Sequence, residues 1–167
     1  LLGELAPAAG TVYRAPSMRV GYLNQELMRA ALPLDTTVLD ATRAVDPRSA
    51  AETRNLLAQF HFTGDQVFKR LRDLSAGERI RLELARMAAS GANLLILDEP
   101  TSHLDLPAIE QLEAALQDYK GAILAVSHDR AFLSRVGFAH VYETENGTLH
   151  ISSTQSLQPA ASAEPRR

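Results

Sequence analysis

Residues 94–105 read LLILDEPTSHLD and decide the fold of this chain. The first four are apolar without alternation, which is typical of a short strand covered on both faces of a parallel sheet. Residues 122–126, AILAV, have the same pattern. Between the two runs, Pro107 suits the first position of a helix, and apolar residues at helical spacing continue that helix to residue 119. The segment therefore predicts a βαβ crossover in an α/β fold.

Two adjacent carboxylates, Asp98 and Glu99, follow the first apolar run. In open α/β folds, ligands bind at the edge of the sheet where parallel strands end. Mg²⁺ on nucleotide phosphates prefers oxygen ligands, and a second carboxylate one residue later can orient or deprotonate an attacking water. A lone Asp-Glu-Pro is more often a solvated turn, so this interpretation depends on the rest of the chain.

Ser75 begins a further helix with a capping box, because Glu78 lies three residues later and can accept a hydrogen bond from the backbone N–H of the cap. Apolar residues at helical spacing follow from Ile80 onward. Taken alone, Ser75 and Gly77 are more often part of a plain helix cap than of a ligand site.

Shorter segments predict the remaining elements on either side of these motifs. In the first half we expect a helix end at residues 1–5, strands at 11–14 and 19–23, helices at 37–44 and 51–60, and a helical or irregular stretch at 62–71. In the second half we expect a short helix capped by Asp129 and a hairpin between residues 139–143 and 148–152, turning at Glu145-Asn146-Gly147.

Composition narrows the class of protein. The formal charge of −3 gives no broad basic field, which argues against dominant electrostatic binding to nucleic acid. Without cysteine the chain has neither disulfides nor thiolate metal sites, which fits a reducing compartment. No apolar run approaches the roughly 20 residues that span a bilayer. We expect a cytoplasmic protein with no transmembrane segment in this chain.

Four motifs, in a fixed order, resemble those of ATP-binding-cassette ATPases. LSAGE at 74–78 resembles the signature, LLILDEPTSHLD resembles Walker B and the D-loop, SHDR at 127–130 resembles the switch region, and GYLNQE around Gln25 resembles the Q-loop. The resemblance covers about residues 21–135. It implies a P-loop NTPase-like α/β fold, with a partly parallel sheet, flanking helices and a small helical insert at about 37–89, and it implies ATP and Mg²⁺ as cofactors.

The resemblance also implies roles for individual residues. Glu99 and His128 would be catalytic, with His128 contacting the γ-phosphate and holding the water or Glu99. Asp98 and Gln25 would hold Mg²⁺, partly through water. The implied nucleotide-binding residues are Gln25, Ser75, Ala76, Gly77, Glu78 and Asp105. The signature would bind ATP held by a second cassette in a head-to-tail nucleotide sandwich, and Asp105 would communicate across that dimer.

Two residues depart from the usual motifs. Ala76 stands where a second glycine is usual, and Ser102 stands where the D-loop region usually has Asn. Neither change removes a catalytic group, but the methyl of Ala76 could crowd the approach of backbone to phosphate. Taken alone, His128 is more often a strand-end histidine, Gln25 a surface amide and Asp105 a helix cap.

Within the family, three stretches most resemble the ABC-F branch: DEPTSHLD, VSHDRAFL and FTGDQVFKRLRDLSAGERIRLELARM. Its members are soluble proteins with paired cassettes that act on ribosomes in translation or antibiotic resistance, so the resemblance implies the ribosome as a partner. Two alternatives stay open: the nucleotide-binding subunit of an ABC membrane transporter, and a non-hydrolysing binding module. The presence of Glu99 and His128 counts against the second.

The P-loop pattern G-x-x-x-x-G-K-[ST] occurs nowhere, and neither Lys69 nor Lys120 follows a glycine. We therefore expect a P-loop shortly before Leu1 in the intact protein, which makes residues 1–153 a partial nucleotide-binding domain without its N-terminal part. We expect ATPase activity from the intact protein and inactivity from this fragment alone. In the family the strand before the P-loop lies centrally in the sheet, so without it we expect exposed apolar faces on the sheet. The composition of residues 154–167 predicts a disordered tail.

Overall fold

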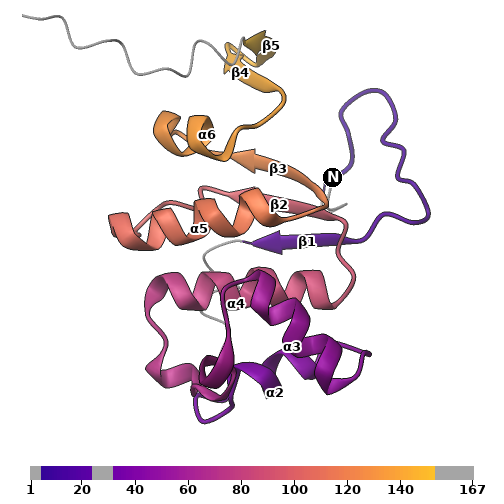
Figure 1. Ribbon diagram of the computed structural model, residues 1–167. Coiled ribbons are helices and arrows are strands. Elements are labelled where there is room, and N and C mark those ends of the chain that lie inside the picture. Colours follow the sequence, from indigo (N-terminus) through magenta and orange to yellow (C-terminus); the bar gives the residue numbers. More distant parts are fainter. Residues whose placement is uncertain (1–4, 24–31, 153–167) are drawn as a thin grey trace, which may run out of the picture.

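A three-stranded parallel sheet forms the centre of the fold in the computed structural model, which describes residues 5–23 and 32–152 (Figure 1). Its strands lie in the order β1 (Val20–Leu23), β2 (Leu94–Asp98) and β3 (Ala122–Val126). Tyr22 is in register with Ile96, which is in register with Leu124. Helix α5 (Leu106–Asp118) joins β2 to β3, so the predicted βαβ crossover is confirmed.

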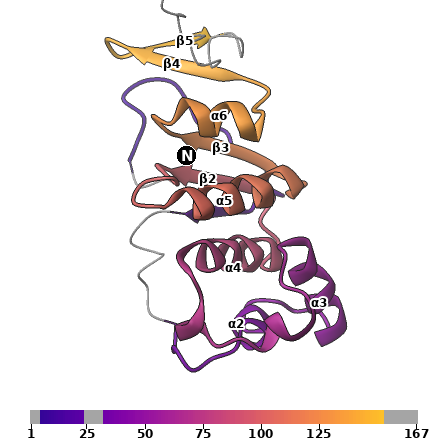
Figure 2. The same cartoon turned by 60° about the vertical axis from the view of Figure 1, so that its left-hand side comes forward.

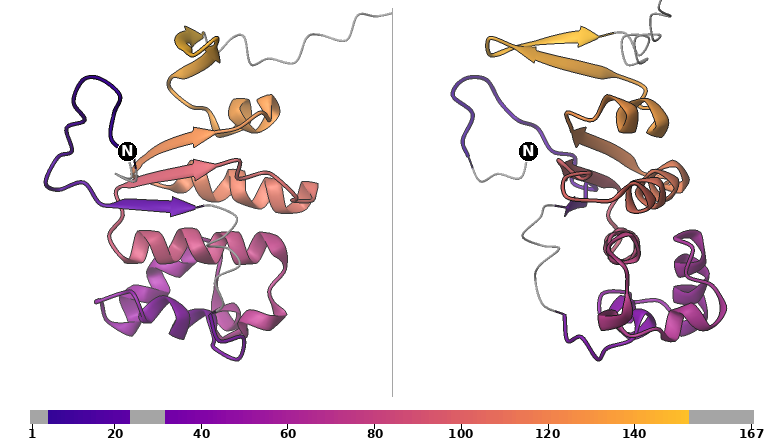
Figure 3. Two further views of the ribbon diagram at one scale, coloured as in Figure 1. Left: turned by 180° about the vertical axis from the view of Figure 1, so that it is seen from behind. Right: turned by 90° about the vertical axis from the view of Figure 1, so that its left-hand side faces the viewer.

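Helices cover one face of this sheet. In the right-hand view of Figure 3, α5 and α6 (Arg130–Val136) lie on one side of the strands, and the segment before β1 passes on the other. The covered face includes Gly21, which lies against Met87 of α4 (Ala76–Ala89), and the fully buried Leu95 and Leu97. Burial of these side chains is the main force that fixes the helices on the sheet.

The other face of β3 is open in the part of the chain that the structure describes. Leu124 is 41% exposed and Val126 is 56% exposed, whereas Ile96 on the neighbouring strand is buried. The prediction of a strand covered on both faces is therefore wrong for β3, because no described helix packs over Leu124 and Val126. The predicted exposed apolar face is confirmed.

A helical layer lies on the far side of α4 from the sheet, as Figure 2 shows. Its elements are α2 (Val38–Arg43), α3 (Ala50–Gln59) and the 3₁₀ turns η1 (Gly64–Phe68) and η2 (Leu71–Asp73). Thr37 caps α2, and Ser49 caps α3 with a capping box. Both predicted helices are confirmed, and the uncertain stretch forms 3₁₀ turns. Buried Leu57 and Phe62 join this layer to the core of the sheet.

A hairpin follows α6, formed by β4 (Val141–Glu145) and β5 (Thr148–Ser152). Asn146 and Gly147 at its turn have φ angles of 49° and 78°, as a tight two-residue hairpin requires. The predicted hairpin is confirmed, although its first strand begins and ends two residues later than predicted. No helix among residues 5–23 and 32–152 is long and apolar enough to cross a membrane.

The predicted strand at residues 11–14 is wrong. These residues pair with no strand in the described chain, and Val12 and Tyr13 are exposed. Side chains that bury so little surface cannot offset the conformational entropy lost when a strand forms. The predictions for residues 1–4 and 154–167, and for Gln25, lie outside the described residues.

Candidate functional site

The predicted metal ligand Asp98 and the predicted catalytic residue Glu99 lie where β2 ends. Asp98 is the last residue of β2 and is in register with Val126, the last residue of β3. The backbone N–H of Glu99 donates to the carbonyl oxygen of Val126 at 2.9 Å, so pairing continues one residue beyond the strand. In Figure 1 the carboxyl ends of the strands and the N-terminal end of α5 lie on the same side. This edge is where open α/β sheets bind ligands.

Glu99 and His128 come together across this edge. Glu99 Oε1 lies 3.3 Å from His128 Nε2, and the Glu99 side chain is 30% exposed while that of His128 is 97% exposed. Glu99 has a φ of 46°, in the left-handed region. Such a conformation is strained for a glutamate, and residues of this kind cluster at active sites. The geometry suits a carboxylate that acts on a water molecule while an imidazole holds it.

The turn that carries His128 is fixed on both sides. The backbone N–H of Asp129 donates to Ser127 Oγ at 3.0 Å, and Asp129 Oδ1 accepts a hydrogen bond from the backbone N–H of Phe132, also at 3.0 Å. Asp129 is therefore the N-cap of α6, as predicted. The backbone of the turn is ordered by these bonds while the imidazole stays open to solvent.

Asp98 offers an exposed carboxylate beside this pair. No group of three or more His, Cys, Asp or Glu side chains among the described residues could hold a metal ion by itself. Mg²⁺ commonly binds through one or two carboxylates together with water and substrate phosphates. A single exposed Asp at a strand end therefore fits Mg²⁺ carried by a nucleotide. The second predicted ligand, Gln25, lies outside the described residues.

The predicted capping box begins α4. Ser75 Oγ accepts from the backbone N–H of Glu78 at 3.2 Å, and Glu78 Oε2 accepts from the backbone N–H of Ser75 at 2.8 Å. The first amides of a helix have no partner within it, and here they belong to Ala76 and Gly77. Such amides, with the positive end of the helix dipole, form a common binding site for phosphate.

Ala76 and Gly77 have different environments. Ala76 is exposed, whereas Gly77 is buried against α5. A Cβ on Gly77 would lie 2.8 Å from Gln111 Oε1 and 3.0 Å from Ala108 Cα. The packing of the two helices therefore requires glycine at position 77 and permits a methyl group at position 76.

Lys69 is a residue of this region that the sequence did not suggest. Its Nζ lies 2.9 Å and 2.8 Å from the two carboxylate oxygens of Glu78. Burial raises the pKa of Glu78, but the hydrogen bonds from Lys69 and from the Ser75 amide outweigh it and hold that pKa below its ordinary value. Both oxygens of Glu78 thus have protein partners, which argues against direct contact between this carboxylate and a nucleotide.

Asp105 lies between the end of β2 and the start of α4. Its Oδ1 accepts from the backbone N–H of Ala108 at 3.0 Å, so it is the N-cap of α5, as predicted. Ala108 in turn lies against Gly77 at the start of α4. The first turn of α5 therefore connects the end of β2 with residues 75–78. Within the described chain, no hydrogen bond or ion pair joins residues 75–78 to Glu99 or His128.

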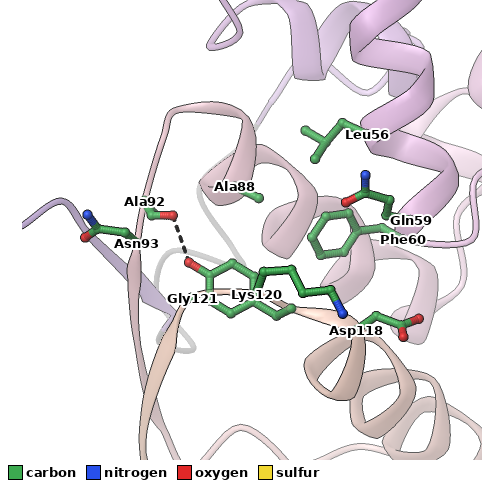
Figure 4. A pocket seen from close by; sticks show the side chains of 10 residues that line it. Leu56, Gln59, Phe60, Ala88, Ala92, Asn93, Asp118, Lys120 and Gly121 are labelled. Atoms are coloured by element: carbon green, nitrogen blue, oxygen red, sulfur yellow. Dashed lines mark hydrogen bonds between the residues drawn. The ribbon is translucent and has the colours of Figure 1, made fainter.

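A pocket of about 250 Å³ lies at the opposite edge of the sheet, near the start of β3 (Figure 4). The Tyr119 hydroxyl donates to the carbonyl oxygen of Ala92 at 2.8 Å, and the ring lies so close to Gly121 that a Cβ there would be 2.6 Å away. The lining includes none of the predicted site residues.

Comparisons with known proteins agree with these motifs. The ABC transporter family model matches residues 1–102. YdiF of Bacillus subtilis (strain 168) is 45% identical over 137 residues, which cover 81% of this chain and 21% of YdiF. The ribosome protection protein VmlR of the same organism is 39% identical over 147 residues, which cover 88% of this chain and 26% of VmlR.

Two further matches extend this result. ABC transporter F family member 5 of Arabidopsis thaliana is 39% identical over 150 residues, which cover 89% of this chain and 22% of the relative. A solved chain of a metal-chelate type ABC transporter, in an inward-facing conformation, has a TM-score of 0.69 at 21% identity and shares the fold over 93% of this chain and 65% of its own. The chain spans only 21% to 26% of the length of these three curated relatives.

Sequence and fold together give a single assignment. The motifs occur in the family's order, and the sheet and helices form a P-loop NTPase-like α/β fold. The curated relatives reported above are of the ABC-F type. The chain belongs to the ABC transporter family of ATP-binding-cassette proteins.

Proposed function

We propose that this chain supplies the catalytic edge and the signature helix of a cassette that hydrolyses ATP. The observation that carries the proposal is the 3.3 Å approach of Glu99 Oε1 to His128 Nε2 at the carboxyl ends of β2 and β3. Glu99 would accept a proton from the attacking water, because a carboxylate within hydrogen-bond reach of the water can act as general base. His128 would orient Glu99 and then contact the γ-phosphate.

Asp98 would hold Mg²⁺, with Gln25 as the second protein ligand, partly through water. The ion supplies positive charge next to the phosphates when it is bound. The support for Asp98 is its exposed position at the end of β2, one residue before Glu99.

The N-terminus of α4 would bind the γ-phosphate of ATP held by a second cassette. The hydroxyl of Ser75 and the amides of Ala76 and Gly77 are suitable donors, and the helix dipole favours an anion there. Asp105 would transmit changes across that dimer, since the α5 turn that it caps packs on Gly77 through Ala108. Glu78 would act by fixing the helix end rather than by touching the nucleotide.

We propose that the complete protein acts on the ribosome and lies in the cytoplasm. The relatives of the ABC-F type support this proposal, and one of them, VmlR, is named as a ribosome protection protein. A transporter subunit is the alternative, and it would require a membrane partner. A test should therefore separate ribosome association from membrane association.

The test uses the complete product of the gene that contains this sequence. We expect ATP turnover to fall by a factor of about 10² or more in Glu99→Gln, as for loss of a general base, with nucleotide binding retained. Glu110→Gln, which changes an exposed glutamate on α5, is the matched control and should turn over ATP normally. Unchanged turnover in Glu99→Gln would refute the role of Glu99.

The same Glu99→Gln protein distinguishes a ribosomal partner from a membrane partner. If the protein acts on ribosomes, ATP should increase its cosedimentation with ribosomes, because the variant holds the nucleotide without hydrolysing it. Recovery with the membrane fraction and not with ribosomes would support the transporter alternative.

The 167-residue chain alone should bind Mg-ATP weakly or not at all, since it contains no P-loop pattern. Isothermal titration that gave low micromolar affinity would contradict this.

A further inference from the structure

One lysine, Lys69, forms an ion pair with the carboxylate of Glu78 at the start of α4. Glu78 occupies the third position of the helix, where its carboxylate accepts the backbone N–H of Ser75. The same carboxylate receives both hydrogen bonds from Lys69 Nζ, at 2.9 Å and 2.8 Å. Among the residues that the structure describes, Lys69 is thus the side chain that binds Glu78 directly.

Glu78 has two opposing effects on this helix end. A negative charge in the first turn stabilises the helix by interacting with its dipole. The same charge repels any phosphate that approaches the amides of Ala76 and Gly77, because the phosphate and the carboxylate are both negatively charged. An uncompensated Glu78 would therefore favour the helix and oppose nucleotide binding.

Lys69 is held in place by its own backbone. Its carbonyl oxygen accepts the N–H of Val38 at 3.0 Å, and its N–H donates to the carbonyl oxygen of Gln66 at 3.1 Å. The next residue, Arg70, forms a β-bridge with Thr37. These bonds attach Lys69 to the start of α2, so the fold rather than the flexible side chain brings its charge to Glu78.

The pair is partly shielded from water. The Glu78 side chain is 15% exposed and that of Lys69 is 36% exposed, so the interaction is screened less than one between fully exposed groups. Arg81 lies farther along α4 and directs its guanidinium to the carbonyl oxygens of Phe60 and His61. Arg81 adds positive potential near Glu78, while its guanidinium hydrogen bonds go to Phe60 and His61.

We propose that Lys69 is a positioning residue that neutralises Glu78, so that the N-terminus of α4 stays attractive to a nucleotide phosphate. This inference rests on the proposed function of the signature helix. It predicts that ATP affinity follows the net charge of the pair at positions 69 and 78, and not merely the integrity of the ion pair.

The test compares four forms of the complete gene product. Lys69→Met removes the positive charge of the pair, Glu78→Gln removes its negative charge, and the double variant restores the neutrality of the pair. We expect Lys69→Met to raise the KM for ATP by about tenfold, as one unit of nearby charge can do. Glu78→Gln should lower KM, and the double variant should return KM to within about twofold of the parent.

Glu78→Gln is the variant that keeps the inference testable if Lys69→Met folds poorly, because glutamine also completes a capping box. Lys120→Met, which changes an exposed lysine at the far edge of the sheet, is the matched control and should not alter KM. Thermal unfolding of each variant reports its structural effect separately.

The outcomes distinguish this inference from its premise. If Lys69→Met and Glu78→Gln both weaken ATP binding, or if the double variant is no better than Lys69→Met, the pair is structural and the inference is wrong. If the parent protein shows no ATP turnover that Glu99→Gln removes, the proposed function itself fails. Turnover that depends on Glu99, with KM following the order of charge, supports both.

Discussion

Replacement of Gly77 by alanine tests how closely α4 and α5 pack at the proposed signature site. The added Cβ would lie 3.0 Å from Ala108 Cα and 2.8 Å from Gln111 Oε1. The Gln111 amide can rotate away, but Ala108 Cα is backbone and can move only if the two helices separate. The substitution therefore strains a contact between helices rather than a single side chain.

The magnitude follows from two opposing effects. Overpacking of a buried site typically costs about 1–3 kcal/mol. Alanine is favoured over glycine within a helix by up to about 1 kcal/mol, and less at the second position of α4. We expect Gly77→Ala to lower the free energy of unfolding by about 1–2 kcal/mol, which for a chain of this size lowers Tm by about 2–8 °C.

The assay is urea unfolding of the 167-residue chain, followed by circular dichroism, with an unchanged m value as the sign of a pure stability change. Ala76→Gly is the matched control one residue earlier, and as an exposed site it should change stability by no more than about 0.5 kcal/mol. Adding Gln111→Ala to Gly77→Ala should recover only part of the loss, because the contact with Ala108 remains. Equal stability of Gly77→Ala and the parent would refute the close packing.

Two other predictions concern the N-terminal ends of α4 and α5. The pKa of Glu78 lies below its ordinary 4.5, so the contribution of its carboxylate to stability is present above that pH and is lost as pH falls through the lowered value. In urea unfolding between pH 6 and pH 3, the free energy of unfolding should therefore fall less in Glu78→Gln than in the parent. Asp105→Ala should lower stability by about 0.5–2 kcal/mol through loss of the cap on the Ala108 amide, whereas Asp105→Asn should retain most of it.

Local patterns in the sequence predicted much of the fold. Capping residues such as Ser75 and Asp105 act on amides three residues away, so their hydrogen bonds could be inferred from spacing alone. The apolar runs of β2 and β3 likewise predicted parallel strands from a short local pattern. The strand predicted at residues 11–14 failed, because a local pattern does not show whether a neighbouring strand is present to pair with it.

The candidate site was predictable in part. Asp98, Glu99 and His128 follow strands that end at one edge, so their proximity follows from topology together with the family resemblance. The role of Lys69 was not predictable, because Lys69 lies between two 3₁₀ turns, η1 and η2, and no regular period relates its position to the start of α4. Only the structure shows that both carboxylate oxygens of Glu78 are bound by Lys69 Nζ.

By itself, the sequence determined the family, the order of its motifs and the residues that cap each helix, because these depend on residue identity and short spacing. Tertiary structure decided which of two adjacent signature residues must be small: Gly77 lies against α5 and Ala76 faces solvent. It also decided which charge compensates Glu78. The physical reason is the same in both cases, since contacts between distant segments depend on how helices pack, and packing is a property of the whole folded chain.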